Sequence, residues 1–155
     1  MCPAPSQPTI ECMLMTGSDA IDAERAFTRS TRSRRRAALK ARLLRRPGGA
    51  LPVHDERRLR RGGPVRGIRE VPLDAIAGTI EPSRANMFDA CFRPTAAARA
   101  RWQRVWLAEH RGQVLPPISV AMTEDGYVVR DGHHRVSVAR ARGALTIDAT
   151  VDGAV

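Results

Sequence analysis

The positive charge of this chain is concentrated in one segment, which limits where a folded core can form. Residues 25–69 contain 16 Lys and Arg against two Asp and Glu, a net charge of +14, whereas residues 70–155 contain ten of each kind. So much charge of one sign opposes collapse into a core. In a chain of 155 residues we therefore expect one folded domain over residues 64–155. An Arg-rich helical arm over residues 19–63 and a disordered leader over residues 1–18 are expected before it.

The arm has the pattern of one long helix. No Pro or Gly interrupts residues 19–46, acidic residues stand early in this run and arginines stand late, as the helix dipole favours. Its apolar residues form a narrow stripe, so we expect the helix to bury little and to depend on a partner for stability. The stripe consists of Ala38, Leu39 and Leu43, with Ala41 and Leu44 beside it.

The composition of the arm favours binding to nucleic acid. Arginine-rich segments bind phosphate backbones without sequence specificity. The arm contains one Phe, Tyr or Trp residue, Phe27, so base stacking is not indicated. Two alternatives remain open. The arm could be a solvated tail whose arginines reflect coding bias, or a segment that binds an anionic membrane surface.

Membrane insertion and cysteine chemistry are not predicted. The longest apolar run near the start is residues 12–15, far short of the roughly 20 residues that a spanning helix needs. The three cysteines, Cys2, Cys12 and Cys91, include no C-x-x-C pair, and their odd number does not predict a disulfide framework or a Cys-only zinc site. We therefore expect a cytoplasmic protein without a metal site of its own.

The second half of the chain predicts an α+β fold with a small mixed sheet and packed helices. A hairpin is expected where the turn sequence T-E-D-G at residues 123–126 separates two β-rich runs. Residues 78–94 have the pattern of an irregular loop, and the spacing of Trp102 and Trp106 predicts that both face the core from a helix. The expected strands are residues 65–71, 118–122, 127–130 and 145–151, and the expected helices are residues 95–110 and 133–142.

A strand, a glycine and a helix follow one another from residue 127, and this order is typical of an anion site. Gly132 lets the backbone approach a ligand, and the first helical turn presents free N–H groups at the positive end of the helix dipole. His133 and His134 open that turn, and Arg135 offers a guanidinium fork that fits phosphate oxygens. Asp131 suits such a site if it holds a metal, accepts a ribose hydroxyl or orients a histidine. The expected ligand is a nucleoside di- or triphosphate, with or without Mg²⁺.

This stretch resembles the ParB/sulfiredoxin superfamily, and the resemblance covers residues 68–151. ParB proteins have the sequence G-E-R-R at the head of a helix that follows a strand, and Gly132, His133, His134 and Arg135 occupy the corresponding places. The resemblance implies a domain that binds nucleotide phosphates through these four residues. His133 replaces the glutamate of that sequence, and His134 replaces its first arginine. The resemblance therefore does not imply CTP hydrolysis or a CTP-driven clamp.

Another branch of the superfamily, the free-serine kinases and related domains, has the sequence D-G-H-H-R that stands here at residues 131–135. This resemblance implies phosphotransfer, with Asp131 and His134 at the site and Glu81 or Asp89 as the base. The favoured function is thus a ParB-like nucleotide-binding domain whose basic arm binds nucleic acid. A small-molecule phosphotransferase is the alternative.

Other functions are less favoured by the sequence. Sulfiredoxins have G-C-H-R at this place, and their reactive cysteine corresponds to His133, so sulfinic acid reduction is not expected. A ParB-like nuclease would need a cluster of metal-binding carboxylates, and none is evident. Residues 131–135 could also be a surface turn followed by a capped helix. A homodimer is neither predicted nor excluded.

Overall fold

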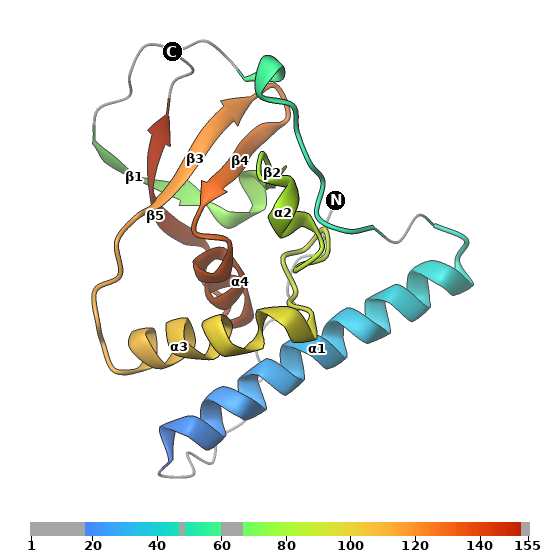
Figure 1. Ribbon diagram of the computed structural model, residues 1–155, viewed down its shortest axis with the longest axis vertical. Coiled ribbons are helices and arrows are strands. Elements are labelled where there is room, and N and C mark those ends of the chain that lie inside the picture. The colour runs from blue at the N-terminus through green and yellow to red at the C-terminus, as the bar shows by residue number, and fades with distance from the viewer. Residues whose placement is uncertain (1–17, 47–48, 60–66, 153–155) are drawn as a thin grey trace.

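The computed structural model describes residues 18–46, 49–59 and 67–152, and it confirms the predicted α+β fold class (Figure 1). Residues 1–17 of the expected leader lie outside the described residues. Residues 65 and 66 of the first expected strand also lie outside them. The strands are β1 (Ile68–Pro72), β2 (Ile76–Thr79), β3 (Ile118–Thr123), β4 (Gly126–Asp131) and β5 (Thr146–Asp152). The helices are α1 (Asp19–Leu43), α2 (Pro82–Ala85), α3 (Arg99–His110) and α4 (His133–Ala141), with short 3₁₀ helices η1 (Glu56–Arg58), η2 (Leu73–Ala75) and η3 (Ala96–Ala98).

The five strands form one mixed sheet in the order β1-β5-β3-β4-β2. Strands β1 and β5 are antiparallel, as are β3 and β4, whereas β3 is parallel to β5 and β2 is parallel to β4. The predicted hairpin is the β3–β4 pair. In its turn the Asp125 N–H donates to Thr123 Oγ1 at 3.2 Å, and this hydroxyl donates to the Gly126 carbonyl at 3.0 Å.

Strand β2 corrects the expectation that residues 78–94 are an irregular loop throughout. Its sequence, I-A-G-T, is too short and too weakly alternating to predict a strand. A segment from the expected arm lies alongside it: the Thr79 N–H donates to the Pro52 carbonyl at 2.9 Å, and the His54 N–H donates to the Thr79 carbonyl at 2.8 Å. A Cβ at Gly78 would lie 2.4 Å from the Pro52 oxygen, so this close approach requires glycine.

The helices cover one side of the sheet in layers. Figure 1 shows α4 next to the sheet, α3 beyond it and α1 on the outer side of α3. The buried faces of α3 and α4 meet at Trp102, whose Nε1–H donates to Ser137 Oγ at 2.9 Å. Trp102 and Trp106 are both buried, as predicted. The main core lies between the sheet and α4 and includes Leu51, Val71, Phe88, Phe92, Ile118, Val120, Val129, Val136 and Val151.

Helix α1 confirms the predicted helix but buries a different face. The stripe around Leu39 and Leu43 is not buried, since these side chains are 59% and 75% exposed. Instead Ala23 and Phe27, in the first half of the helix, pack with Trp102 in a second apolar cluster. The helix buries little and packs on a partner, as expected, but the local pattern did not identify the contact face, because Phe27 and Trp102 are 75 positions apart in sequence.

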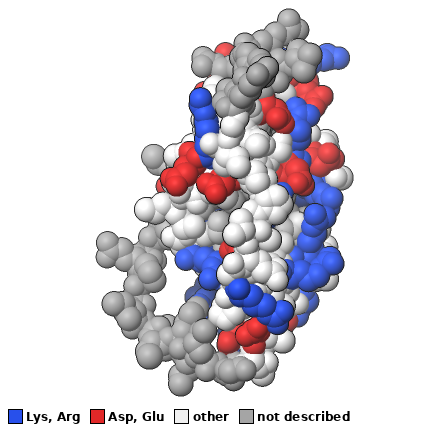
Figure 2. Space-filling view, turned by 90° about the vertical axis from the view of Figure 1, so that its left-hand side faces the viewer, with Lys and Arg blue, Asp and Glu red and all other residues white. Residues whose placement is uncertain are grey.

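The acidic and basic side chains of α1 also differ in their contacts with the rest of the protein. Its acidic residues Asp19 and Glu24 pair with Arg111, the C-cap of α3, and with Arg99 of α3, at 2.8 and 2.6 Å. No ion pair between described residues involves an arginine of α1. On the face shown in Figure 2, basic side chains are most frequent along the right-hand edge, acidic ones lie among them in its upper part, and side chains of both charges are scattered over the rest of the face.

Within the described ranges, none of the helices has the length and hydropathy of a membrane-spanning segment. Cys91 is disulfide-bonded, and the number and spacing of the cysteines did not predict this bond.

Candidate functional site

The junction of β4 and α4 is built around Gly132. This residue is the N-cap of α4 and has a φ of +104°, a conformation that glycine adopts without strain. A Cβ at this position would lie 2.4 Å from Ile118 Cγ2 of the neighbouring strand. The first helical hydrogen bond runs from the Val136 N–H to the Gly132 carbonyl at 3.0 Å. The N–H groups of residues 133–135 therefore have no acceptor within the helix.

A small pocket opens at the start of α4, and residues of β4, α2 and α3 also line it. Residues 131–135 line it together with Arg84 of α2 and with Arg101 and Val105 of α3. The structure thus gathers the contiguous residues that the sequence singled out, and adds two arginines that the sequence did not assign to the site. Neither arginine forms an ion pair with any described residue. No local signal could have identified them, because only the tertiary fold brings them together.

His133 is buried and held by a hydroxyl. Its Nε2 lies 2.7 Å from Thr79 Oγ1 at the end of β2, and its ring stacks on Phe88 with an interplanar angle of 17°. Burial lowers the pKa of His133 from 6.5 to about 4, and the positive charge of Arg84 contributes to that shift in the same direction. The ring is therefore neutral near pH 7.

His134 is buried without a partner for one ring nitrogen. Its side chain is 6% exposed and meets the edge of Phe88 with ring centroids 5.2 Å apart. The Nε2 atom is buried and has no hydrogen-bond partner among the described residues. Burial, followed by the charges of Arg101 and Arg84, lowers the pKa of His134 to about 4.

Arg135 lines the pocket, but most of its guanidinium is engaged elsewhere. One terminal nitrogen donates to the carbonyls of Pro116 and Pro117, the latter at 2.8 Å, and the other pairs with Asp131 at 2.9 Å. The predicted phosphate fork therefore holds the loop before β3 in place. Asp131 is 69% exposed, and its charge is offset by Arg135.

The two predicted bases lie in different surroundings. Glu81 follows β2, accepts a hydrogen bond from Ser83 at 2.9 Å and is close enough for its charge to favour protonated His133. Asp89 accepts hydrogen bonds from the N–H groups of Cys91 and Arg93 and from the Arg93 side chain, each at 2.9 Å. Neither carboxylate lines the pocket, and Asp89 is occupied within its own loop.

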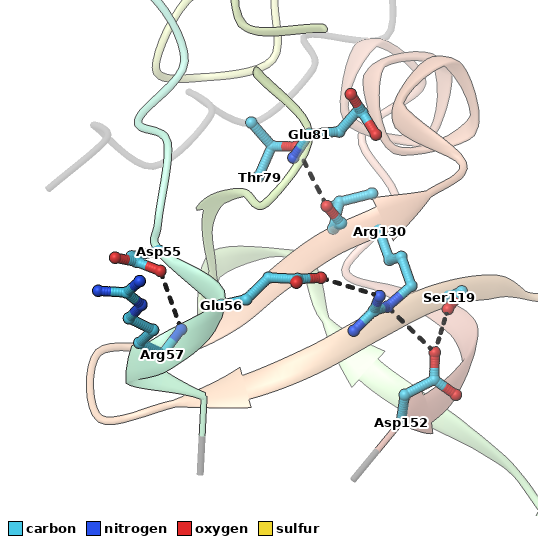
Figure 3. Close-up of polar contacts among 9 residues, drawn as sticks. Asp55, Glu56, Arg57, Thr79, Glu81, Ser119, Arg130 and Asp152 are labelled. Carbon is cyan, nitrogen blue, oxygen red and sulfur yellow. Dashed lines mark hydrogen bonds and ion pairs between the residues drawn. The ribbon is translucent and has the colours of Figure 1, made fainter. Parts of the chain in front are cut away.

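Figure 3 shows Thr79 and Glu81 together with a second polar cluster centred on Arg130. Arg130 pairs with Glu56 of η1 at 3.2 Å and with Asp152 of β5 at 3.5 Å. Asp152 also accepts a hydrogen bond from Ser119 at 2.7 Å. Because carboxylates surround Arg130, this cluster holds η1 on the sheet and does not attract anions. Across the described ranges, no group of three or more His, Cys, Asp or Glu residues could hold a metal ion.

No protein-family model matches this chain, and no curated protein matches its sequence. Among solved structures, sulfiredoxin from Arabidopsis thaliana is similar, with a TM-score of 0.42 and 19% sequence identity over 57% of this chain and 86% of that chain. A similarity at this level says nothing of the ligand or chemistry of this chain. The resemblance of residues 131–135 to the D-G-H-H-R branch stays a prediction.

Proposed function

We propose that the pocket at the start of α4 binds the phosphate group of a nucleotide. The observation that carries the proposal is His134, which is buried, has an unpartnered Nε2 and lines the same pocket as Arg84 and Arg101. A buried polar atom without a hydrogen bond costs free energy. A ligand oxygen that accepts from this nitrogen would remove that cost.

The electrostatics of the pocket favour an anion. Arg84 and Arg101 face it without ion-pair partners among the described residues, and the N-terminus of α4 adds the positive end of a helix dipole. The one carboxylate in the lining, Asp131, is offset by Arg135. The net charge of the pocket lining is therefore positive, which favours binding of the negatively charged phosphate.

The size of the pocket suits a phosphate group better than a whole nucleotide. Its volume is about 40 Å³, which leaves room for a group of a few atoms. In this proposal the phosphate enters the pocket and the nucleoside stays outside, where Asp131 is exposed and can accept a hydrogen bond from a ribose hydroxyl. The base of the nucleotide would then contribute little to selectivity.

A phosphotransferase is the alternative function. It needs a base close to the bound phosphate, and Glu81 is the better candidate because its charge acts on His133 whereas Asp89 is occupied by Arg93. Turnover distinguishes the alternatives. Transfer of phosphate to a small hydroxyl compound that stops in Glu81→Gln would favour the enzyme, and binding without transfer would favour the binding domain.

Helix α1 supports a second part of the proposal, non-specific binding of nucleic acid. Arg25, Arg29, Arg32 and Arg36 recur at spacings of four, three and four residues, so they follow one face of the helix, and all four are exposed. Since no described carboxylate pairs with them, they are available to phosphate groups.

The pocket proposal is tested by calorimetric titration of ATP, ADP, CTP and GTP, each with Mg²⁺, into the full chain. We expect binding of at least one nucleotide, and a loss of about tenfold or more in affinity in Arg84→Ala and in Arg101→Ala. Arg104→Ala is the matched control, because Arg104 is an exposed arginine of the same helix as Arg101 that does not line the pocket. Absence of binding by the folded protein, or equal loss in the control, would overturn the proposal.

A further inference from the structure

The hydroxyl of Thr79 determines how His133 can bind a ligand. Thr79 Oγ1 has three neighbours: the Val129 carbonyl at 3.1 Å, the Glu81 N–H at 2.8 Å and His133 Nε2 at 2.7 Å. A hydroxyl has one hydrogen to donate and can accept two. The carbonyl can only accept, and the N–H can only donate. All three contacts are hydrogen bonds only if Thr79 donates to Val129 and His133 Nε2–H donates to Thr79.

This arrangement fixes the tautomer of the neutral His133 ring. With the hydrogen on Nε2, the remaining ring nitrogen, Nδ1, carries a lone pair and can only accept a hydrogen bond. His133 lines the pocket, so Nδ1 is the nitrogen left for a ligand. The other tautomer would make Thr79 donate to His133 and would break the Thr79–Val129 hydrogen bond.

We propose that His133, held in this tautomer by Thr79, makes the pocket select an oxyanion that carries a hydrogen, such as a terminal phosphate, over one that carries none, such as sulfate. The inference rests on the proposed function and adds a selectivity to it. A protonated phosphate oxygen donates to Nδ1. Sulfate has no hydrogen to donate, so it binds only if His133 changes tautomer or takes up a proton.

The surroundings of His133 oppose proton uptake. Phe88 and Phe92 pack on the ring, and the residue is 4% exposed. When sulfate binds, a change of tautomer therefore requires less free energy than proton uptake by His133. The change of tautomer breaks one hydrogen bond. The charged groups that act on His133 are Arg84 of α2, Arg101 of α3, Asp131 of β4 and Glu81 after β2, with the second histidine, His134, beside it.

The test is an NMR titration of the full chain with inorganic phosphate and with sulfate, followed at the backbone N–H signals of His133 and His134. At pH 6 we expect phosphate to bind about fivefold to tenfold more tightly than sulfate, which is the factor that one hydrogen bond provides. The preference should persist at pH 8, because inorganic phosphate that has released its second proton still carries one hydrogen, whereas sulfate carries none. Thr79→Val should abolish the preference, because His133 is then free to change tautomer, whereas Thr79→Ser should keep it.

The outcomes separate the selectivity from the proposed function. Equal affinities of the wild-type protein for phosphate and sulfate at pH 6 would overturn the inference and leave the proposed function standing. Binding of neither anion by the folded protein would remove both. If Thr79→Val does not fold, the ratio of affinities of the wild-type protein for phosphate and sulfate at pH 6 and at pH 8 still tests the selectivity.

Discussion

Phe27 of α1 meets Trp102 of α3 edge to face, with ring centroids 5.5 Å apart and an interplanar angle of 68°. Both side chains are fully buried. This contact attaches the arginine-rich helix to the domain, so the arginines of α1 are held at a fixed position relative to the rest of the protein.

Replacing Phe27 by Ala should lower the free energy of unfolding by about 3 to 5 kcal/mol, the usual effect of removing a buried phenyl ring. Urea unfolding measures the change. Leu43→Ala, on the exposed half of the same helix, should change it by less than about 0.5 kcal/mol. Similar small effects of both substitutions would mean that α1 is not packed on the domain in solution.

The parts of the fold that were predictable have strong local signals. The T-E-D-G turn between β3 and β4 and the glycines that flank α4 set the bounds of those elements within a residue or two. Strand β2 and the buried face of α1 were missed, because each is determined by a partner distant in sequence: β4 and the Pro52 backbone for β2, and Trp102 for α1.

In the candidate site, too, the contacts between residues distant in sequence were not predicted. The sequence singled out residues 131–135 because a strand, a glycine and a helix follow one another there, and the structure brings them into one pocket. Arg84 and Arg101 come from α2 and α3, so no local pattern marks them. The hydrogen bonds from Arg135 to the Pro116 and Pro117 carbonyls could not be predicted from the sequence either, because they depend on the position of the loop before β3 relative to the start of α4.

Gly132→Ala should destabilise the protein by about 2 to 4 kcal/mol, because the new Cβ is strained at a φ of +104° and also collides with Ile118. Gly143→Ala is the matched control. Its φ of +75° is also positive, but nothing lies within 4 Å of the added Cβ, so it should cost only about 1 to 2 kcal/mol. Equal losses of stability in thermal or urea unfolding would show that the contact with Ile118 does not matter.

Stability should fall as the pH is lowered from 7 to 5. Both pocket histidines have a pKa of about 4 in the folded protein against 6.5 when unfolded. The unfolded chain therefore binds more protons in this window, which favours unfolding by on the order of 2 kcal/mol per histidine at pH 5. Urea midpoints at the two pH values measure the change. A stability that is flat or rises towards pH 5 would show that these rings are not buried as described.

His134→Leu should leave stability at pH 7 unchanged or raise it, because it replaces a buried, unpartnered polar ring with an apolar side chain. The same substitution should remove about half of the pH dependence and weaken nucleotide binding by about tenfold or more. Unfolding and calorimetry on one preparation provide all three values. A drop in stability with unchanged binding would mean that His134 is a structural residue only.

Removing the charges of Arg29 and Arg36 together by substitution with Gln should weaken retention of DNA or RNA. The slope of log affinity against log salt should fall by about 1.8, because each phosphate that the protein neutralises contributes roughly 0.9 to that slope. Arg69 and Arg104, also exposed, provide a control with the same change in net charge. Equal effects of the two double substitutions would indicate a response to net charge alone and would contradict a binding face on α1.

The most direct test of phosphate binding is the ¹⁵N chemical shift of His134 Nε2 with and without a saturating nucleotide. If the ligand supplies the missing hydrogen-bond partner, this signal should move while the signals of His54 and His110, which lie outside the pocket lining, stay in place. An unchanged His134 signal in a folded protein that binds the nucleotide would place the ligand elsewhere and contradict the account of the site.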